Sequence, residues 1–109
     1  MAVFILSKTK SGQYCDQFHS NQGELLLQGL EYFSKEDCLQ AIASVRKITK
    51  FDRFFDRRTS SQQMFYFDLR TLHGDIVGSG RHYEVMQARE DCIAFLMNYA
   101  FDAETEDRT

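Results

Sequence analysis

The glycine-rich stretch HGDIVGSGRHYE, His73–Glu84, is the first candidate for chemistry, because glycine-rich loops can hold phosphate groups. A phosphate-binding P-loop lies directly between a strand and a helix, and a lysine follows its last glycine. In GDIVGSG two apolar residues fill the middle, no lysine follows, and the helical pattern starts only near Val85. The spacing favours a structural role for the glycines and leaves the roles of Arg81 and His82 open.

Cysteine and histidine side chains could supply a nucleophile and a base. Cys15 with His19 or His73 is the pair that a thiol enzyme would use, and it would require a lowered thiol pKa at Cys15. The spacing does not require such a pair, and no two ligands stand at a spacing typical of metal sites. Three cysteines without a C-x-x-C motif indicate free thiols in a reducing compartment. We therefore predict no catalytic residue, no metal and no cofactor.

A basic segment with interleaved aromatic residues runs from residue 46 to residue 58. Cations next to aromatic rings are typical of platforms for single-stranded nucleic acid. The acidic residues Asp52 and Asp56, the net charge of −3 and the expected burial of Phe54 and Phe55 argue against this function. Nucleic-acid binding is therefore the alternative interpretation, with these contact residues: Arg46, Lys47, Lys50, Arg53, Arg57 and Arg58.

The composition is that of one folded domain, with 109 residues of which 43% are hydrophobic, including ten Phe and five Tyr. No apolar run approaches the roughly 20 residues of a membrane span, and the start of the chain lacks the basic residues of a signal peptide. The sequence predicts a soluble cytoplasmic protein. Its charge is uneven, because residues 46–81 carry eight basic and four acidic side chains, whereas residues 82–109 carry two and seven.

The elements that must position these residues are predicted from an internal repeat with an offset of 51 residues. Residues 13–45 align with residues 64–96 without a gap. Several residue types coincide: Gly23 falls on Gly74, Gly29 on Gly80, and Tyr32 on Tyr83. Matches on a single diagonal that preserve glycine and aromatic positions indicate a duplication.

Each copy is expected to form three strands and a helix. In the first copy, strands are predicted at residues 2–8, 13–19 and 24–30, and Ser34 caps a helix with Asp37 at its third position. The inner face of this helix is Cys38, Ala41, Ile42 and Val45. In the second copy, strands are predicted near residues 54–58, 64–70 and 75–80, and a helix near residues 85–99 with Cys92, Ile93 and Leu96 inside.

Two βββα units of about 50 residues cannot each bury a core of their own. The sequence therefore predicts an α+β fold, in which one antiparallel sheet has both helices packed on one face and a pseudo-twofold axis relates the halves. The first repeat spans residues 1–50 and the second spans residues 51–101. Residues 102–109, DAETEDRT, form a polar acidic tail that we expect to be mobile.

The motifs SKEDCLQAIASVRK (residues 34–47) and YFDLRTLHGDIVGSG (residues 66–80) resemble the YegP-like family of small bacterial proteins, in its two-copy form. The resemblance covers nearly the whole chain and implies the tandem βββα fold. It implies no activity, because the family is functionally uncharacterised. The chain departs from the family pattern at Asp16, where an apolar strand residue is usual, and at Gln22-Gly23, where Asn-Gly is usual.

Asp16 stands where the second copy has Phe67, and strand alternation places it inward between Tyr14 and Phe18. We expect this strand to be an edge strand, bulged or short, which would leave Asp16 in water. The alternative is a partly buried carboxylate with a perturbed pKa and a functional role.

The second helix carries apolar residues where the first copy has mostly polar ones. The positions of Ser44, Arg46, Ile48 and Lys50 hold Phe95, Met97, Tyr99 and Phe101 in the second copy. A helix that is apolar nearly all round is usually covered, here by the first helix or by a partner. The main functional interpretation is a non-enzymatic interaction module, including a small inhibitor-type binder, that contacts a protein partner or a second copy through these four residues.

Overall fold

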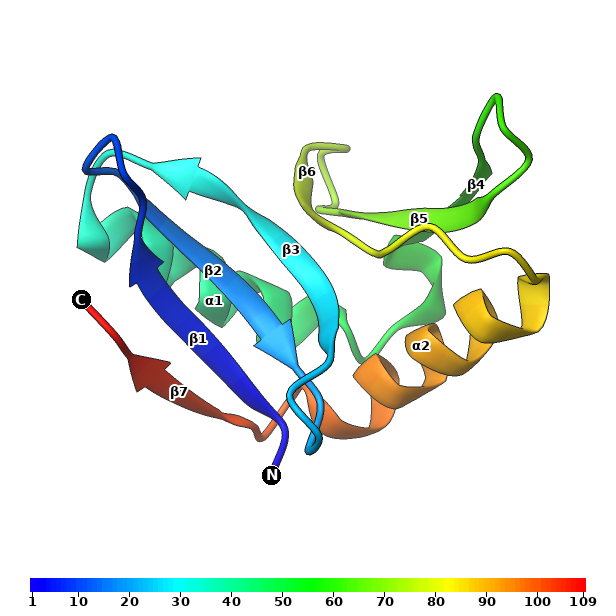
Figure 1. The fold of residues 1–109 in the computed structure, drawn as a ribbon. Helices are drawn as coiled ribbons and strands as arrows, with labels where there is room; N and C mark the ends of the chain where they lie inside the picture. Colours follow the sequence, from blue (N-terminus) through cyan, green and yellow to red (C-terminus); the bar gives the residue numbers. More distant parts are fainter.

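The two halves of the chain form the same series of elements, as Figure 1 shows. The computed structural model describes residues 1–109. The first half forms β1 (Val3–Lys8), β2 (Tyr14–His19), β3 (Leu25–Tyr32) and α1 (Lys35–Ile48). A 3₁₀ turn, η1 (Asp52–Phe54), leads to β4 (Phe55–Thr59), β5 (Phe65–Arg70), β6 (Ile76–Ser79), α2 (Met86–Tyr99) and a last strand, β7 (Glu104–Asp107). Apart from β7, these elements lie close to the predicted ranges.

All seven strands belong to one sheet with the order β4-β5-β6-β3-β2-β1-β7. Every neighbouring pair is antiparallel except β1 and β7. The halves meet where β3 pairs with β6, and there Gln28 lies opposite Ser79, its counterpart in the repeat. The predicted α+β fold is confirmed, and the strand order is consistent with the predicted pseudo-twofold relation.

The prediction of a mobile tail is wrong, because residues 104–107 form β7 beside β1 (Figure 1). The guanidinium of Arg46 on α1 donates two hydrogen bonds to the carbonyl of Ala103, at 3.1 and 2.8 Å, and a third to Thr105 Oγ1 at 2.6 Å. Lys35 Nζ pairs with the carboxylate of Asp107 at 2.5 Å. A polar segment can pair with the free edge of a sheet through its backbone N–H and C=O groups. The polar composition of residues 102–109 is therefore compatible with a strand.

One hydrophobic core lies between the sheet and the helices. Strand residues with period 2 enter it, such as Phe4 and Leu6 of β1 and Phe67 and Leu69 of β5, which are all fully buried. The helices contribute the buried residues Cys38, Ile42 and Val45 from α1, and Cys92, Ile93 and Leu96 from α2. All of these residues form a single cluster, so both helices pack on the same face of the sheet. Neither helix is long and apolar enough to cross a membrane.

Candidate functional site

The glycine-rich stretch that first suggested chemistry serves the fold. Gly74 has a φ of +89° and closes the β5–β6 turn by donating its N–H to the carbonyl of Thr71 at 2.9 Å. Residues other than glycine rarely adopt this left-handed conformation. Gly80 lies against the ring of Phe67, where any β-carbon would overlap. The predicted structural role of both glycines is confirmed.

Arg81 and His82, whose roles the sequence left open, both contact other residues of the chain. Arg81 Nη1 lies 3.4 Å from Glu24 Oε2, and the ring of His82 stacks on that of Tyr66 with centroids 4.4 Å apart. Both contacts join the end of β6 to neighbouring segments. Arg81 and His82 therefore have a structural explanation.

The structure separates Cys15 from His19, one of the two candidate bases of a thiol enzyme; the other, His73, lies in the turn between β5 and β6. Cys15 Sγ lies 3.3 Å from Ser7 Oγ, whereas Nε2 of His19 lies 2.9 Å from Gln17 Oε1. Cys15 and His19 are four residues apart on β2, which corresponds to about 13 Å along a strand. No group of three or more His, Cys, Asp or Glu side chains is placed to hold a metal ion.

The other two cysteines are buried under the sheet. Burial raises the pKa of the Cys38 thiol to about 12, and the negative charge of Asp16 adds to this effect. Burial also raises the pKa of Cys92. Both thiols are therefore protonated at neutral pH, and the thiolate is the nucleophilic form. Cys38 and Cys92 act as small packing residues, in agreement with their predicted inward positions.

Asp16 is buried, and the expectation that it lies in water is wrong. Only 1% of its surface is exposed. The predicted bulge exists, because the pairing of β2 with β3 shifts between Cys15 and Gln17. However, β2 lies between β1 and β3 and is no edge strand. The alternation that buries Phe67 in β5 therefore also buries Asp16.

The carboxylate of Asp16 has few polar partners. Cys38 Sγ donates a hydrogen bond to Oδ1 at 3.8 Å, and the same carboxylate packs against Gly29. Burial raises the pKa of Asp16 to about 6, although the Cys38 hydrogen bond acts in the opposite direction. Burial and the charge of Asp16 raise the pKa of Tyr32 to about 12. Asp16 lines neither of the two cavities of the molecule. Because its pKa is raised by burial, its protonation is coupled to the stability of the fold.

The cations of the basic segment make contacts within the chain. Arg46 holds the tail, as described above. Arg57 pairs with Asp52 and Glu90 at 2.8 and 2.9 Å, and Arg58 pairs with Asp56 at 3.1 Å. Two further cations lie over aromatic rings: Arg53 over Phe51 and Phe54, and Lys50 over Phe101. Of the six predicted contact residues only Lys47 makes none of these contacts, so no observation favours nucleic-acid binding here.

Three of the four apolar residues of the predicted interaction surface lie on α2, and the fourth follows it. Phe95 and Tyr99 lie one helical turn apart, with ring centroids 4.6 Å apart. Met97 is two residues from each, which corresponds to a rotation of about 200° and places it on the other side of the helix. Phe101 lies beyond Tyr99, the last residue of α2. The ring of Phe101 is approached by Lys50 Nζ at 3.5 Å from its centroid.

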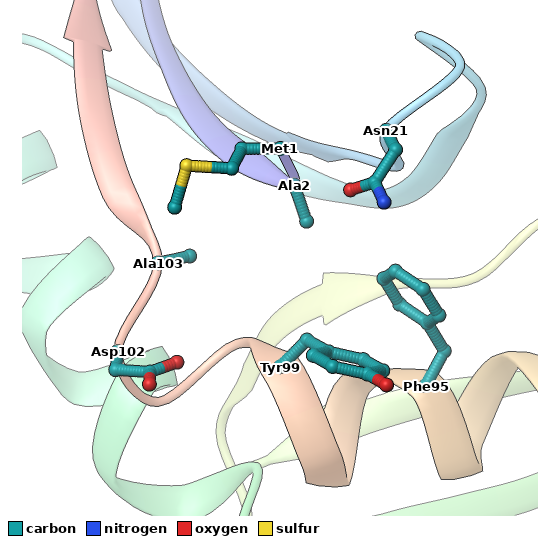
Figure 2. Close-up of a pocket in the computed structure, with 7 residues that line it drawn as sticks. All are labelled: Met1, Ala2, Asn21, Phe95, Tyr99, Asp102 and Ala103. Carbon is teal, nitrogen blue, oxygen red and sulfur yellow. The ribbon is translucent and has the colours of Figure 1, made fainter.

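Phe95 and Tyr99 line a cavity of about 380 Å³ between α2 and the first half of the chain. Figure 2 shows the two rings on α2 facing Ala2 and Asn21 across this cavity. The remaining lining residues come from the two ends of the chain: Met1, Asp102 and Ala103. Phe95 also packs on Phe18 in the core, at 6.4 Å between centroids, whereas Tyr99 is 54% exposed.

A second cavity of about 360 Å³ shares Phe95 as a wall. It lies between α2 and the β2–β3 hairpin, and its other lining residues are Ser20, Gln22, Glu24, Leu26, Tyr83, Ala88, Asp91 and Cys92. We refer to the two cavities together as the α2 seam. The sequence pointed to Phe95 and Tyr99 through their departure from the first copy. It gave no signal for Asn21 or Ala103, because only the fold brings a turn and the tail to this helix.

The comparisons with known proteins agree with the fold. Residues 60–107 match the family described as "Domain of unknown function (DUF1508)". The UPF0339 protein YegP of Escherichia coli strain K12 is 34% identical over 91 residues, which cover 84% of this chain and 83% of that protein. The chain belongs to the UPF0339, or YegP-like, family. A UPF0339 protein of Bordetella pertussis is 31% identical over 109 residues, which cover 100% of this chain and 98% of that protein.

Two solved UPF0339 structures have the same fold. The solution NMR structure of yegP from E. coli, described as a protein of unknown function, has a TM-score of 0.93 and 30% identity, and it covers 99% of this chain and 93% of that chain. A UPF0339 protein from Shewanella oneidensis, also solved by NMR in solution, has a TM-score of 0.91 and 22% identity, with coverages of 97% and 90%. The predicted family resemblance is confirmed, and these names assign no activity.

Proposed function

We propose that this UPF0339 protein is a non-enzymatic interaction module that binds a segment of another protein in the α2 seam. The observation that supports this function is the position of Phe95 and Tyr99, two aromatic rings that line an open cavity. The equivalent positions of the first copy, Ser44 and Ile48, carry no aromatic ring. Aromatic rings provide a large contact area at a low entropic cost and are enriched in binding hot spots.

The shape and chemistry of the seam favour a protein segment over a substrate. Two neighbouring cavities with one shared wall suit two anchoring side chains of one segment, because peptides bind grooves through anchors spaced one or two turns apart. The lining contains no histidine, and its single thiol, Cys92, is protonated at neutral pH. Its one serine hydroxyl, Ser20 Oγ, accepts hydrogen bonds from the backbone N–H groups of Gln22 and Glu24 at 3.3 and 3.2 Å, within its own turn. The seam therefore offers mainly apolar contact.

The test is a selection of random displayed peptides, about 15 residues or roughly four helical turns in length, on the wild-type protein. Recovered peptides are then measured on Tyr99→Ser and Phe101→Ser. These two variants are a matched pair, because both rings stand at the end of α2 and are about half exposed, at 54% and 49%. Only Tyr99 lines the seam.

We expect to recover peptides that bind Tyr99→Ser roughly tenfold more weakly, or weaker still, than the wild type, which is the effect of losing a contact of about 1.4 kcal/mol. The same peptides should bind Phe101→Ser with unchanged affinity. NMR spectra of the free variants would establish that both remain folded. Peptides that bind all three proteins equally would overturn the proposal. Peptides that require Phe101 and tolerate Tyr99→Ser would overturn it as well, because they would place the contact surface beyond the end of α2, beside Lys50.

A further inference from the structure

The charged side chains that line the α2 seam are all acidic: Glu24, Asp91 and Asp102. No lysine, arginine or histidine lines either cavity. Met1, which lines the first cavity, carries the positive α-amino group, and this group forms no ion pair. Glu24 is paired with Arg81 at 3.4 Å, but both side chains are about half exposed, so this pair is weak. Asp91 accepts a hydrogen bond from the neutral amide of Gln87 at 2.8 Å, and no cation pairs with Asp91 or Asp102.

The dipole of α2 adds to the negative potential at one end of the seam. The C-terminus of a helix carries about half a negative charge, which basic residues in the last turn usually offset. Helix α1 follows this pattern with Arg46 and Lys47, whereas α2 has no basic residue in its last turn. Asp102 lies three residues beyond Tyr99, the last residue of this helix, and adds a full negative charge. The nearby ammonium of Lys50 lies over the ring of Phe101, which lines neither cavity, and it forms no ion pair with Asp102.

The floor of the seam is apolar and neutral. Leu26, Phe95 and Ala103 belong to the hydrophobic cluster or pack against it. Burial raises the pKa of Tyr83 above its ordinary value, and it also raises the pKa of Cys92. Both groups are therefore uncharged at neutral pH. An apolar floor with an acidic rim is complementary to a segment that carries apolar and basic side chains.

We infer that the α2 seam binds a cationic amphipathic segment of another protein, with apolar anchors in the two cavities and lysine or arginine side chains beside Asp91 and Asp102. This inference rests on the proposed function and specifies the chemistry of the partner. A second copy of the chain fits the seam less well, because packing seam against seam would bring two acidic rims together.

The experiment uses the seam-dependent peptides defined by the Tyr99→Ser and Phe101→Ser pair. Their composition is compared with that of the unselected library, and their affinity is measured on the double variant Asp91→Asn/Asp102→Asn. The matched control is Glu36→Gln/Asp37→Asn, which removes the same charge from an exposed part of α1 outside the seam. Affinities are measured at about 0.05 M and about 0.5 M salt, where screening differs strongly.

We expect enrichment of lysine and arginine in the seam-dependent peptides. Their affinity should fall about three- to tenfold on Asp91→Asn/Asp102→Asn, as for the loss of two exposed charge pairs, and should also fall at high salt. The control variant should bind like the wild type. Neutral or acidic seam-dependent peptides, or an equal loss on the control variant, would overturn the inference and leave the proposed function standing. The absence of any seam-dependent peptide would overturn both.

Discussion

The side chain of Asp16 occupies the space that a β-carbon on Gly29 would need. The same relationship recurs in the second half, where the ring of Phe67 occupies the space beside Gly80. Asp16 and Phe67 are counterparts in the repeat, and so are the two glycines. Glycine is therefore required on β3 and at the end of β6 because of the residue that lies across from it, whether that residue is a carboxylate or an aromatic ring.

This relationship predicts that Gly29→Ala and Gly80→Ala each lower the free energy of unfolding by about 1–3 kcal/mol, because the added methyl group overpacks the core. Urea denaturation would measure both values. The loss at Gly29 should be mostly recovered in an Asp16→Ala background, where the shorter side chain leaves room for the methyl group. A loss of equal size in both backgrounds would show that the contact with Asp16 is not its cause.

The buried carboxylate of Asp16 predicts a stability that decreases as the pH rises. Its pKa is about 6 in the folded state against an ordinary value of 3.8, so the folded protein binds the proton more tightly than the unfolded chain. The contribution of Asp16 is therefore largest below its ordinary pKa and is lost as the pH rises through the folded value. Between about pH 5 and about pH 8 the change is about 1.4 kcal/mol.

The measurement is the difference in unfolding free energy between the wild type and Asp16→Asn across this pH range. The titratable groups that face Asp16 are Cys38 from α1 and Tyr32 from β3, and both stay protonated and neutral throughout the range. The lowered pKa values of Asp56 and Asp107 make the protein more stable as the pH rises, but this effect is the same in the wild type and in Asp16→Asn and cancels in the difference. Parallel curves for the two proteins would contradict the prediction.

Local pattern predicted most of the fold, because each element buries one face with its own period. Ser34 and the apolar positions of α1 and α2 therefore placed the helices, and the glycine turns placed the hairpins. The burial of Asp16 depends on which strands flank β2, and strand order is a property of the whole sheet. The seam depends on the return of the tail to β1, for which the polar residues 102–109 gave no local signal.

The two helix N-termini predict opposite effects of substitution at equivalent positions. Ser34 Oγ accepts a hydrogen bond from the backbone N–H of Asp37 at 3.1 Å. Val85 has nearly the same backbone conformation, with φ and ψ of −123° and 143° against −120° and 150°, but it makes no such bond. Ser34→Ala should therefore destabilise the protein by about 1 kcal/mol, and Val85→Ser should stabilise it by a similar amount.

Thermal unfolding would measure both changes, with Val85→Ala as the control. Val85 is 59% exposed, so removal of its side chain alone should have little effect on packing. A gain in stability that is the same for Val85→Ala and Val85→Ser would show that the hydroxyl cap is not responsible.

The attachment of the tail through Arg46 predicts a local loss of order in the variant Arg46→Met, which introduces the residue type found at its counterpart, Met97. Methionine retains an apolar stem near the ring of Phe4, but it cannot donate to the carbonyl of Ala103 or to Thr105. Hydrogen bonds from a charged donor contribute about 1.5–3 kcal/mol. Backbone amides of β7 should therefore exchange with solvent at least tenfold faster, whereas amides of β2 and β5 should keep their protection.

Hydrogen exchange followed by NMR resolves these strands separately, and Lys47→Met is the matched control because Lys47 is exposed on the same turn of α1 and has no ion pair with the tail. Faster exchange spread evenly over all strands would indicate a global loss of stability. Unchanged exchange in β7 would indicate that its pairing with β1 holds the tail without Arg46. The predicted result, faster exchange confined to β7, would show that one side chain on α1 determines whether the polar tail is a strand. Because Asp102 and Ala103 line the seam, this variant should also weaken any segment bound there.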